Sequence, residues 1–195
     1  MRKQLIARLY EILENHKNNF GYNYLLNPIP NDFECGIYFF FDKITTIENG
    51  QFKITYIGIT KNNKNNRLDK HKINGPSSFR DHVNKALENL QGISTPNDVN
   101  NYIHNLPYLF IKIPNVDDLK EIEETTIGLV SNYNKISQIH IPDKNWLGFH
   151  HLQSIIPKAH IWNIQHAKTG EIKFNPKNCI DPLNKLYHYS KLIMK

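Results

Sequence analysis

Cysteine and long apolar runs are both scarce in this sequence. Its 195 residues contain two cysteines, Cys35 and Cys179, and no Cys-x-x-Cys pair. This argues against a zinc ribbon or a disulfide framework and favours reduced thiols in a cytoplasmic protein. No apolar run approaches the ~20 residues that span a bilayer. Residues 1–16 include two glutamates, which is unlike a signal or transit peptide.

Most of the chain has no net charge, and the positive excess is confined to one segment. Lys and Arg total 24 and Asp and Glu total 18. Residues 53–85 hold eight basic and two acidic residues, so the remainder, with 16 of each, is neutral. A localised positive field favours a polyanion such as DNA, and the simpler alternative is a solvated helix face. The basic side chains expected to contact DNA are Lys61, Lys64, Lys70, Lys72 and Arg80.

Periodicity predicts an α+β fold. Aromatic and β-branched runs predict strands over residues 36–41, 52–60 and 108–113, with the first two forming a hairpin. Helical spacing predicts an amphipathic helix over residues 2–16, a short helix within 61–72, two helices within 74–106 and a long helix after Pro114. Trp146, Phe149 and Trp162 are expected to be core anchors of a C-terminal extension rather than base-stacking platforms.

The hairpin turn creates a register problem. Asn49-Gly50 is a strong two-residue turn signal, and a tight turn there would place Tyr56 opposite Lys43. Tyr38 would then lie five residues away, roughly 17 Å along the strand. If both tyrosines serve one site, the register must shift, so we predict an irregularity between residues 42 and 51.

Candidate catalytic residues follow the two tyrosines. Arg67 and His71 are four residues apart and therefore share a helix face. On the long helix, Glu123 falls on the side that faces the core, where a carboxylate needs a cation or a metal. Glu124 falls on the more exposed side and is the competing acid. Helix geometry favours Glu123.

This set of side chains suits phosphodiester hydrolysis. It matches no Ser/His/Asp triad, Walker loop or zinc-ligand pattern. Hydrolysis of a phosphodiester needs an activated water, a base and positive charge on the phosphate, which Tyr, His, Arg and a metal-binding carboxylate can supply. The simpler alternative is a basic DNA-binding domain with two core tyrosines.

The order of these motifs resembles the GIY-YIG nuclease domain. The resemblance rests on Gly36-Ile37-Tyr38, Tyr56-Ile57-Gly58, Arg67, His71 and the helix containing Ile122-Glu123. It implies a small three-stranded antiparallel sheet flanked by helices. It also implies a division of the chain into an N-terminal extension (1–34), a nuclease domain (35–134) with a helical insertion (74–106), and a C-terminal extension (135–195).

The resemblance also implies roles for the candidate residues. Tyr38 would be the general base for the attacking water or would orient it, and Tyr56 would hydrogen-bond the phosphate or that water. Arg67 would bind the scissile phosphate, and His71 would assist as a phosphate contact or proton-transfer group. Glu123 would bind one divalent cation, Mg²⁺ or Mn²⁺. A tyrosine with a pKa near 10 is a poor base at pH 7, so it needs help from its neighbours.

Two asparagines compete for the family's closing structural position. Asn134 matches it best, and Asn132 is the alternative. The helical insertion and the C-terminal extension resemble those of GIY-YIG type II restriction endonucleases. The sequence therefore predicts a metal-dependent DNA endonuclease of restriction or phage-defence type, acting as a homodimer, with a cognate methyltransferase encoded nearby. The alternatives are a non-catalytic DNA-binding protein with a nuclease-like fold, or a repair or mobile-element nickase.

Overall fold

The computed structural model describes residues 1–27, 35–46, 52–61, 67–72, 77–133, 141–167 and 175–192. Within them the helices and strands, in chain order, are α1 (Arg2–Phe20), β1 (Gly36–Thr46), β2 (Phe52–Thr60), α2 (Arg67–Lys72), α3 (Ser78–Gln91), α4 (Pro96–His104), β3 (Tyr108–Lys112), α5 (Val116–Val130), η2 (Leu147–His150), α6 (Ile155–Ala159), η3 (Pro176–Cys179) and α8 (Ile180–Ser190).

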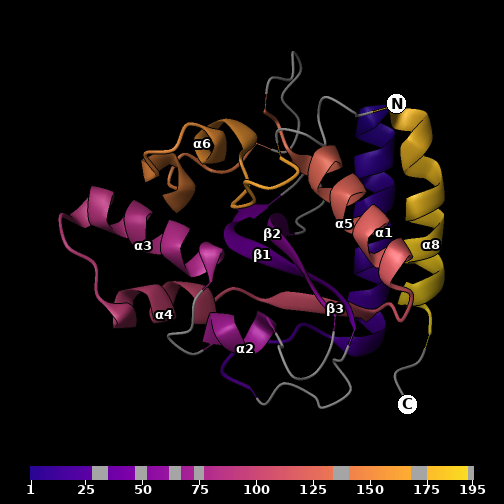
Figure 1. The fold of residues 1–195 in the computed structure, drawn as a ribbon, viewed down its shortest axis with the longest axis horizontal. Coiled ribbons are helices and arrows are strands. Elements are labelled where there is room, and N and C mark those ends of the chain that lie inside the picture. Colours follow the sequence, from indigo (N-terminus) through magenta and orange to yellow (C-terminus); the bar gives the residue numbers. More distant parts are fainter. Residues whose placement is uncertain are drawn as a thin grey trace.

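A three-stranded antiparallel sheet lies between two helical layers (Figure 1). Successive side chains of a strand point to opposite faces, so Ile37 and Phe39 pack in one cluster and Tyr38 and Phe40 in another. The first cluster includes α1, α5 and α8, and the second includes α2, α3, α4 and the buried Trp162. The predicted α+β class with its small flanked sheet is confirmed.

The C-terminal residues cover the free edge of β2, which is the outer strand in the order β2-β1-β3. The backbone N–H of Trp162 donates to the carbonyl of Thr55 at 2.9 Å. The Asn163 side chain accepts from the backbone N–H of Ile57 at 2.9 Å and donates to its carbonyl at 2.7 Å. An exposed edge invites pairing with other chains, and these bonds satisfy it internally.

Arg2 caps the C-terminal end of α5. Its guanidinium donates to the carbonyls of Leu129 and Ser131 at 3.1 and 2.8 Å, and to Oδ1 of Asn132 at 3.1 Å. The last carbonyls of a helix have no partner within it and carry partial negative charge, so a cation there is stabilising. Helix α1 therefore holds the end of α5 as well as packing against the sheet.

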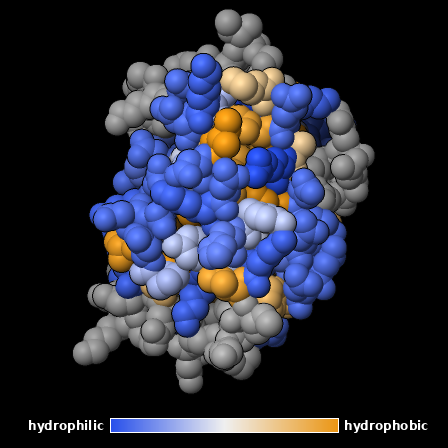
Figure 2. Space-filling model, turned by 90° about the vertical axis from the view of Figure 1, so that its right-hand side faces the viewer, coloured by the Kyte–Doolittle hydropathy of each residue, from blue (hydrophilic) through white to orange (hydrophobic). Residues whose placement is uncertain are grey.

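The sequence pattern did not predict α8. Lys185 lies within 2.8–3.2 Å of carboxylate oxygens of Asp118, Glu121 and Asp181, which joins α8 to α5. Figure 2 shows this side of the molecule as mostly hydrophilic, with small apolar areas. Helices α1 and α8 share one apolar cluster with the sheet. The division into a nuclease domain and two extensions stays a prediction.

The aromatic anchors of the C-terminal part are in the core. Trp146 and Trp162 are fully buried and their ring centroids lie 5.4 Å apart, with Phe149 packed at the side. The prediction that these residues are anchors is confirmed. Of the helices described, none has both the length and the apolar character needed to cross a membrane.

Replacing Asn163 by Leu should destabilise the fold. The substitution leaves the N–H and the carbonyl of Ile57 buried without partners, at about 1–3 kcal/mol for each group. We expect the free energy of unfolding in urea to fall by about 2–4 kcal/mol. The exposed Asn101→Leu is the matched control and should change it by less than about 0.5 kcal/mol. Equal effects of the two substitutions would contradict the edge-covering role.

Candidate active site

The hairpin places both tyrosines on one face of the sheet. Tyr38 pairs with Gly58 across the strands, and Tyr56 pairs with Phe40. The centroids of the two tyrosine rings are 6.3 Å apart, and each hydroxyl takes part in a hydrogen bond with the other. The two motifs are therefore brought together.

The register of the hairpin shifts twice. One shift lies between Asp42 and Thr46, which confirms the predicted irregularity. The other lies between Phe40 and Phe41, outside the predicted interval, where Thr55 is the extra residue on β2. The Asn49-Gly50 turn itself is outside the described residues. Tyr56 pairs with Phe40, which is three residues along β1 from Lys43, the partner that a tight turn predicts.

Gly58 makes room for the Tyr38 ring. A Cβ added to Gly58 would lie 2.4 Å from the Tyr38 hydroxyl oxygen and 2.5 Å from the adjoining ring carbon. Any larger residue would push Tyr38 out of place, because its side chain is fully buried. The glycine of Tyr-Ile-Gly thus has a steric function at this point of the sheet.

Helix α2 supplies a histidine directly to Tyr38. The Tyr38 hydroxyl lies 3.0 Å from Nε2 of His71, and Nδ1 of His71 lies 2.7 Å from Oγ of Ser77. Ser77 is also the N-cap of α3 and accepts from the backbone N–H of Arg80. A continuous hydrogen-bonded chain therefore runs from Tyr56 through Tyr38 and His71 to Ser77.

Burial keeps this chain uncharged. It raises the pKa of Tyr38 well above its usual value, a shift that Tyr56 increases and Arg67 opposes. It raises the pKa of Tyr56 to about 12, again opposed by Arg67. It lowers the pKa of His71 to about 3, helped by Arg67 and Arg80. At neutral pH both phenols keep their protons and the imidazole is neutral.

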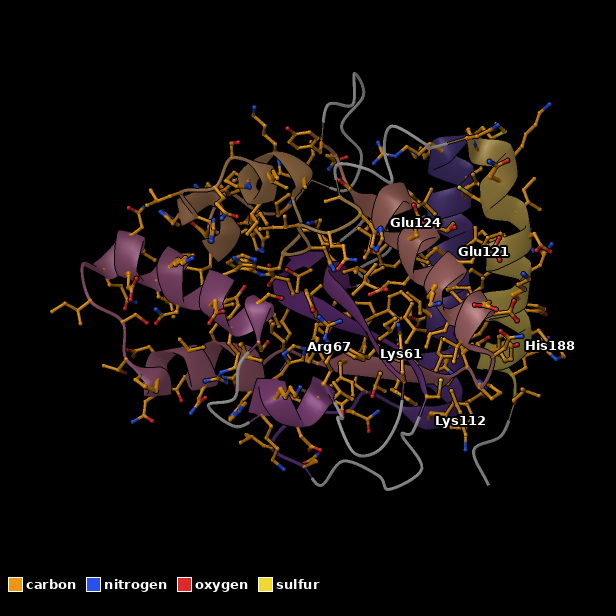
Figure 3. The ribbon with its side chains drawn as sticks, in the orientation of Figure 1. Lys61, Arg67, Lys112, Glu121, Glu124 and His188 are labelled. Atoms are coloured by element: carbon orange, nitrogen blue, oxygen red, sulfur yellow. The ribbon has the colours of Figure 1, made fainter. Side chains whose placement is uncertain are left out.

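A pocket of about 470 Å³ lies beside this row of hydrogen-bonded side chains. Its lining residues come from the end of β2, α2, α5 and the C-terminal part, and they are Ile59, Thr60, Lys61, Arg67, Lys70, Glu123 and Gln165. Figure 3 shows Arg67 and Lys61 between α2 and α5, with Glu121 and Glu124 further along α5. Tyr38 and His71 are at most 1% exposed and do not line the pocket.

Arg67 and Glu123 line the same pocket, and the charge of each affects the pKa of the other. Burial raises the pKa of Glu123 to about 7, while Arg67 and Lys61 lower it. For Arg67, burial works against the charge, but Tyr56, Tyr38 and Glu123 outweigh it and raise the pKa above the usual value. Glu124 is not a lining residue. Of the two acids compared in the sequence, Glu123 is thus the one that the structure places beside Arg67.

The donors in this pocket fit a single Mg²⁺. Mg²⁺ commonly takes one or two carboxylates and completes its octahedron with water and substrate phosphate. Glu123 supplies a carboxylate, and Thr60 adds a buried hydroxyl with no hydrogen-bond partner among the described residues. No group of three or more His, Cys, Asp or Glu side chains is clustered for a metal within the described ranges. Because three cationic side chains share the pocket, we expect the ion to bind together with an anionic substrate.

Two basic residues of the segment 53–85 lie inside the protein. Arg80 is 6% exposed and donates to the carbonyl of His71 at 2.7 Å and to Oδ1 of Asn100 at 2.6 Å. This placement argues against the DNA contact expected for Arg80, because a buried and bonded guanidinium does not reach a DNA backbone. Lys53 is also buried, which lowers its pKa to about 7, and it donates to the carbonyl of His160.

The other expected DNA contacts divide into three cases. Lys61 and Lys70 line the pocket. Lys72 is half-buried and its amino group lies 3.4 Å from the carbonyl of Asn27. Lys64 is outside the described residues. So is Asn134, the residue predicted for the closing structural position.

Asn132, the alternative to Asn134, is buried. It is held by Arg2, by Nδ1 of His160 at 2.9 Å, and by the Ala159 carbonyl, to which its backbone N–H donates. These contacts are structural. Asn132 thus joins α5 to the C-terminal residues.

Sequence patterns missed three residues of this site. Ser77 is the N-cap of α3, and its contact with His71 depends on how α2 and α3 pack. Thr60 ends a strand and Gln165 lies in an irregular segment, and neither carries a periodic signal. A buried hydroxyl and an exposed amide become recognisable as site residues only once the chain is folded.

The structure thus places two paired tyrosines of a small three-stranded sheet beside a pocket lined by Arg67 and Glu123. Residues 89–189, slightly more than half of the chain, match the family model described as the GIY-YIG domain. The chain belongs to this family, and membership supports a nuclease-type enzyme with DNA as substrate. The match includes Glu123 and Gln165, whereas Tyr38 and His71 precede it. No curated protein and no solved structure matches the chain.

The stability of the protein should fall on acidification because His71 is buried in its neutral form. Its folded pKa of about 3 is below the usual 6.5, so the unfolded chain binds the proton first. The stabilising contribution is complete above pH 6.5 and is lost as the pH falls toward 3, at about 1.4 kcal/mol per pH unit.

The measurement is urea unfolding at pH 6.5 and pH 5 for the wild type and His71→Gln. The variant should lose about 2 kcal/mol less than the wild type over this interval. Burial also lowers the pKa of His16, His82, His151 and His160, but these residues are present in both proteins. An equal loss in the two proteins would show that His71 is not buried neutral.

Proposed function

We propose that this protein is a metal-dependent DNA endonuclease that hydrolyses phosphodiester bonds. The observation that carries the proposal is the pocket shared by Arg67 and Glu123, backed by the hydrogen-bonded pair Tyr38–His71. Phosphoryl chemistry needs positive charge at the scissile group, a carboxylate that can hold a metal, and a path for a proton. Arg67 and Glu123 in the pocket can supply the charge and the metal ligand, and the Tyr38–His71 pair beside it can supply the path for the proton.

Arg67 binds the scissile phosphate in this proposal. A guanidinium pairs with two phosphate oxygens at once, and its charge is permanent. Lys61 and Lys70 line the same pocket and contact the phosphates on either side. Glu123 holds the divalent cation, Mg²⁺ or Mn²⁺. When bound, that ion would stabilise the negative charge on the leaving oxygen.

Tyr38 and His71 move the proton. In this proposal, substrate binding brings the attacking water to the Tyr38 hydroxyl, which is buried in the free protein. The water gives its proton to Tyr38 while Tyr38 passes its own to Nε2 of His71, 3.0 Å away. This direction needs the tautomer with the proton on Nδ1, and Ser77 Oγ, 2.7 Å away, can accept the hydrogen bond of that proton. Tyr56 orients the water or the phosphate through its bond to Tyr38. Neutral His71 keeps a lone pair on Nε2 that can receive the proton, although its pKa of about 3 makes it a weak base.

The biological role we propose is restriction or phage defence in the cytoplasm. The helices α3 and α4 and the C-terminal part extend the small sheet domain, as base recognition and dimerisation would require. One such site cuts one strand, so cleavage of both strands needs a homodimer or two successive nicks. A cognate methyltransferase encoded nearby would protect the host DNA.

Incubation with mixed plasmid DNA, with Mg²⁺ or with EDTA, separates this proposal from its alternatives. Discrete fragments support a restriction enzyme, and nicks alone favour a repair or mobile-element nickase. DNA binding without any cleavage would make the protein a non-catalytic DNA-binding protein with a nuclease-like fold.

Glu123→Gln should abolish Mg²⁺-dependent cleavage and leave DNA binding nearly intact. The amide keeps the volume of the side chain but removes the charge that holds the cation, so we expect a loss of at least about 10²-fold in rate. The matched control is Glu124→Gln, one residue along the helix and outside the pocket, which should cut at the wild-type rate. If Glu124→Gln is inactive and Glu123→Gln is active, the assignment of the metal ligand is wrong.

Ser77→Ala should slow cleavage by about 10²-fold, the lower end of what acid–base catalysis contributes. The substitution removes the hydroxyl that, in this proposal, accepts the hydrogen bond of the proton on Nδ1 of His71. It also removes the cap of α3, which costs about 1 kcal/mol of stability. Thr95→Ala removes the equivalent cap of α4 and serves as the control for stability alone. Cleavage rates lowered equally in both variants would contradict a positioning role for Ser77.

A further inference from the structure

Residues 160–167 cross the edge of β2 between two unusual backbone conformations. His160 and His166 have φ of 59° and 63°, and they are the non-glycine residues with positive φ in the described part of the chain. Such a conformation costs of order 1–3 kcal/mol and persists only where the surroundings hold it. Gln165 immediately precedes His166 and lines the pocket.

The segment is fixed on both sides of Gln165. On one side Trp162 and Asn163 hydrogen-bond to the backbone of β2. On the other side the Ser131 hydroxyl donates to the carbonyl of Ala167 at 3.1 Å. These anchors lie two residues before and two residues after Gln165, so its backbone has little freedom to move.

The side chain of Gln165, in contrast, is uncommitted. It is exposed, it lines the pocket that contains Arg67 and Glu123, and it makes no hydrogen bond to any residue that the structure describes. Its neighbour Asn163 uses a similar amide entirely for the fold. A free polar group on a rigid support is the arrangement that recognition of a ligand requires.

We propose that Gln165 recognises the base next to the scissile phosphate and selects adenine there. A glutamine amide can donate from its NH2 group to N7 of adenine and accept at its oxygen from the N6 amino group, which forms a bidentate pair. A strand whose phosphate lies on Arg67 brings an adjoining nucleotide to the other lining residues, and a volume of about 470 Å³ accommodates a group of that size. This inference rests on the proposed nuclease function.

The test is cleavage of a duplex library with randomised positions, followed by sequencing of the cut ends. The wild type should favour adenine at one position beside the cut. Gln165→Ala should lower that preference by about 5- to 100-fold, the discrimination that a bidentate pair provides. Gln165→Glu should move the preference toward cytosine, whose N4 amino group donates to a carboxylate. Gln153→Ala, an exposed glutamine away from the pocket, should keep the wild-type profile.

A selection for bound duplexes, carried out with Glu123→Gln alone and combined with Gln165→Ala, measures the same preference without cleavage. Loss of the adenine preference in the double variant supports the inference even if the wild type proves unable to cut, in which case the proposed catalytic function alone fails. An unchanged profile in the Gln165 variants, in cleavage or in binding, overturns the inference and leaves the nuclease function standing. A wild type that neither cuts nor binds DNA overturns both.

Discussion

The close contact between Tyr38 and Gly58 is the constraint on which the site depends. The Tyr38 ring lies where a side chain at position 58 would be, and this position brings its hydroxyl to His71. His71 in turn meets Ser77, where α3 begins, and its carbonyl accepts from Arg80 of the same helix. One small residue on β2 therefore determines how α2 and α3 meet the sheet.

This buried arrangement separates the two halves of the proposed chemistry. The groups proposed to touch substrate, Arg67 and Glu123, line the pocket, whereas the proposed proton acceptor His71 is buried and does not line it. Burial strengthens the hydrogen bonds of Tyr38 and His71. The same burial raises the pKa of Tyr38, so an isolated phenolate is not available and the proton must move through neighbours as the reaction proceeds.

Sequence patterns predicted the sheet, the order of its flanking helices and the strands that carry the two tyrosines, because these features depend on local periodicity and turn chemistry. The spacing of Arg67 and His71 correctly placed them on one helix, yet it could not show that one faces the pocket and the other the interior. Charge counting likewise could not show that Arg80 and Lys53 are buried, because their burial depends on helices and loops distant in the sequence. Gln165 carried no local signal, because its position is created by bonds to a strand more than a hundred residues earlier.

The contact of Arg2 with the end of α5 has a consequence for how the protein folds. Arg2 and its partners at the end of α5 are separated by 127 residues or more along the chain. His16, also in α1, is hydrogen-bonded to the backbone carbonyl of Ser190. Contacts of such long range form late and slow folding, because a large loop must close first. During synthesis α1 leaves the ribosome long before α5 and α8 exist, with its apolar side uncovered. The nascent chain therefore passes through a stage in which it depends on dilution or on a chaperone to avoid aggregation.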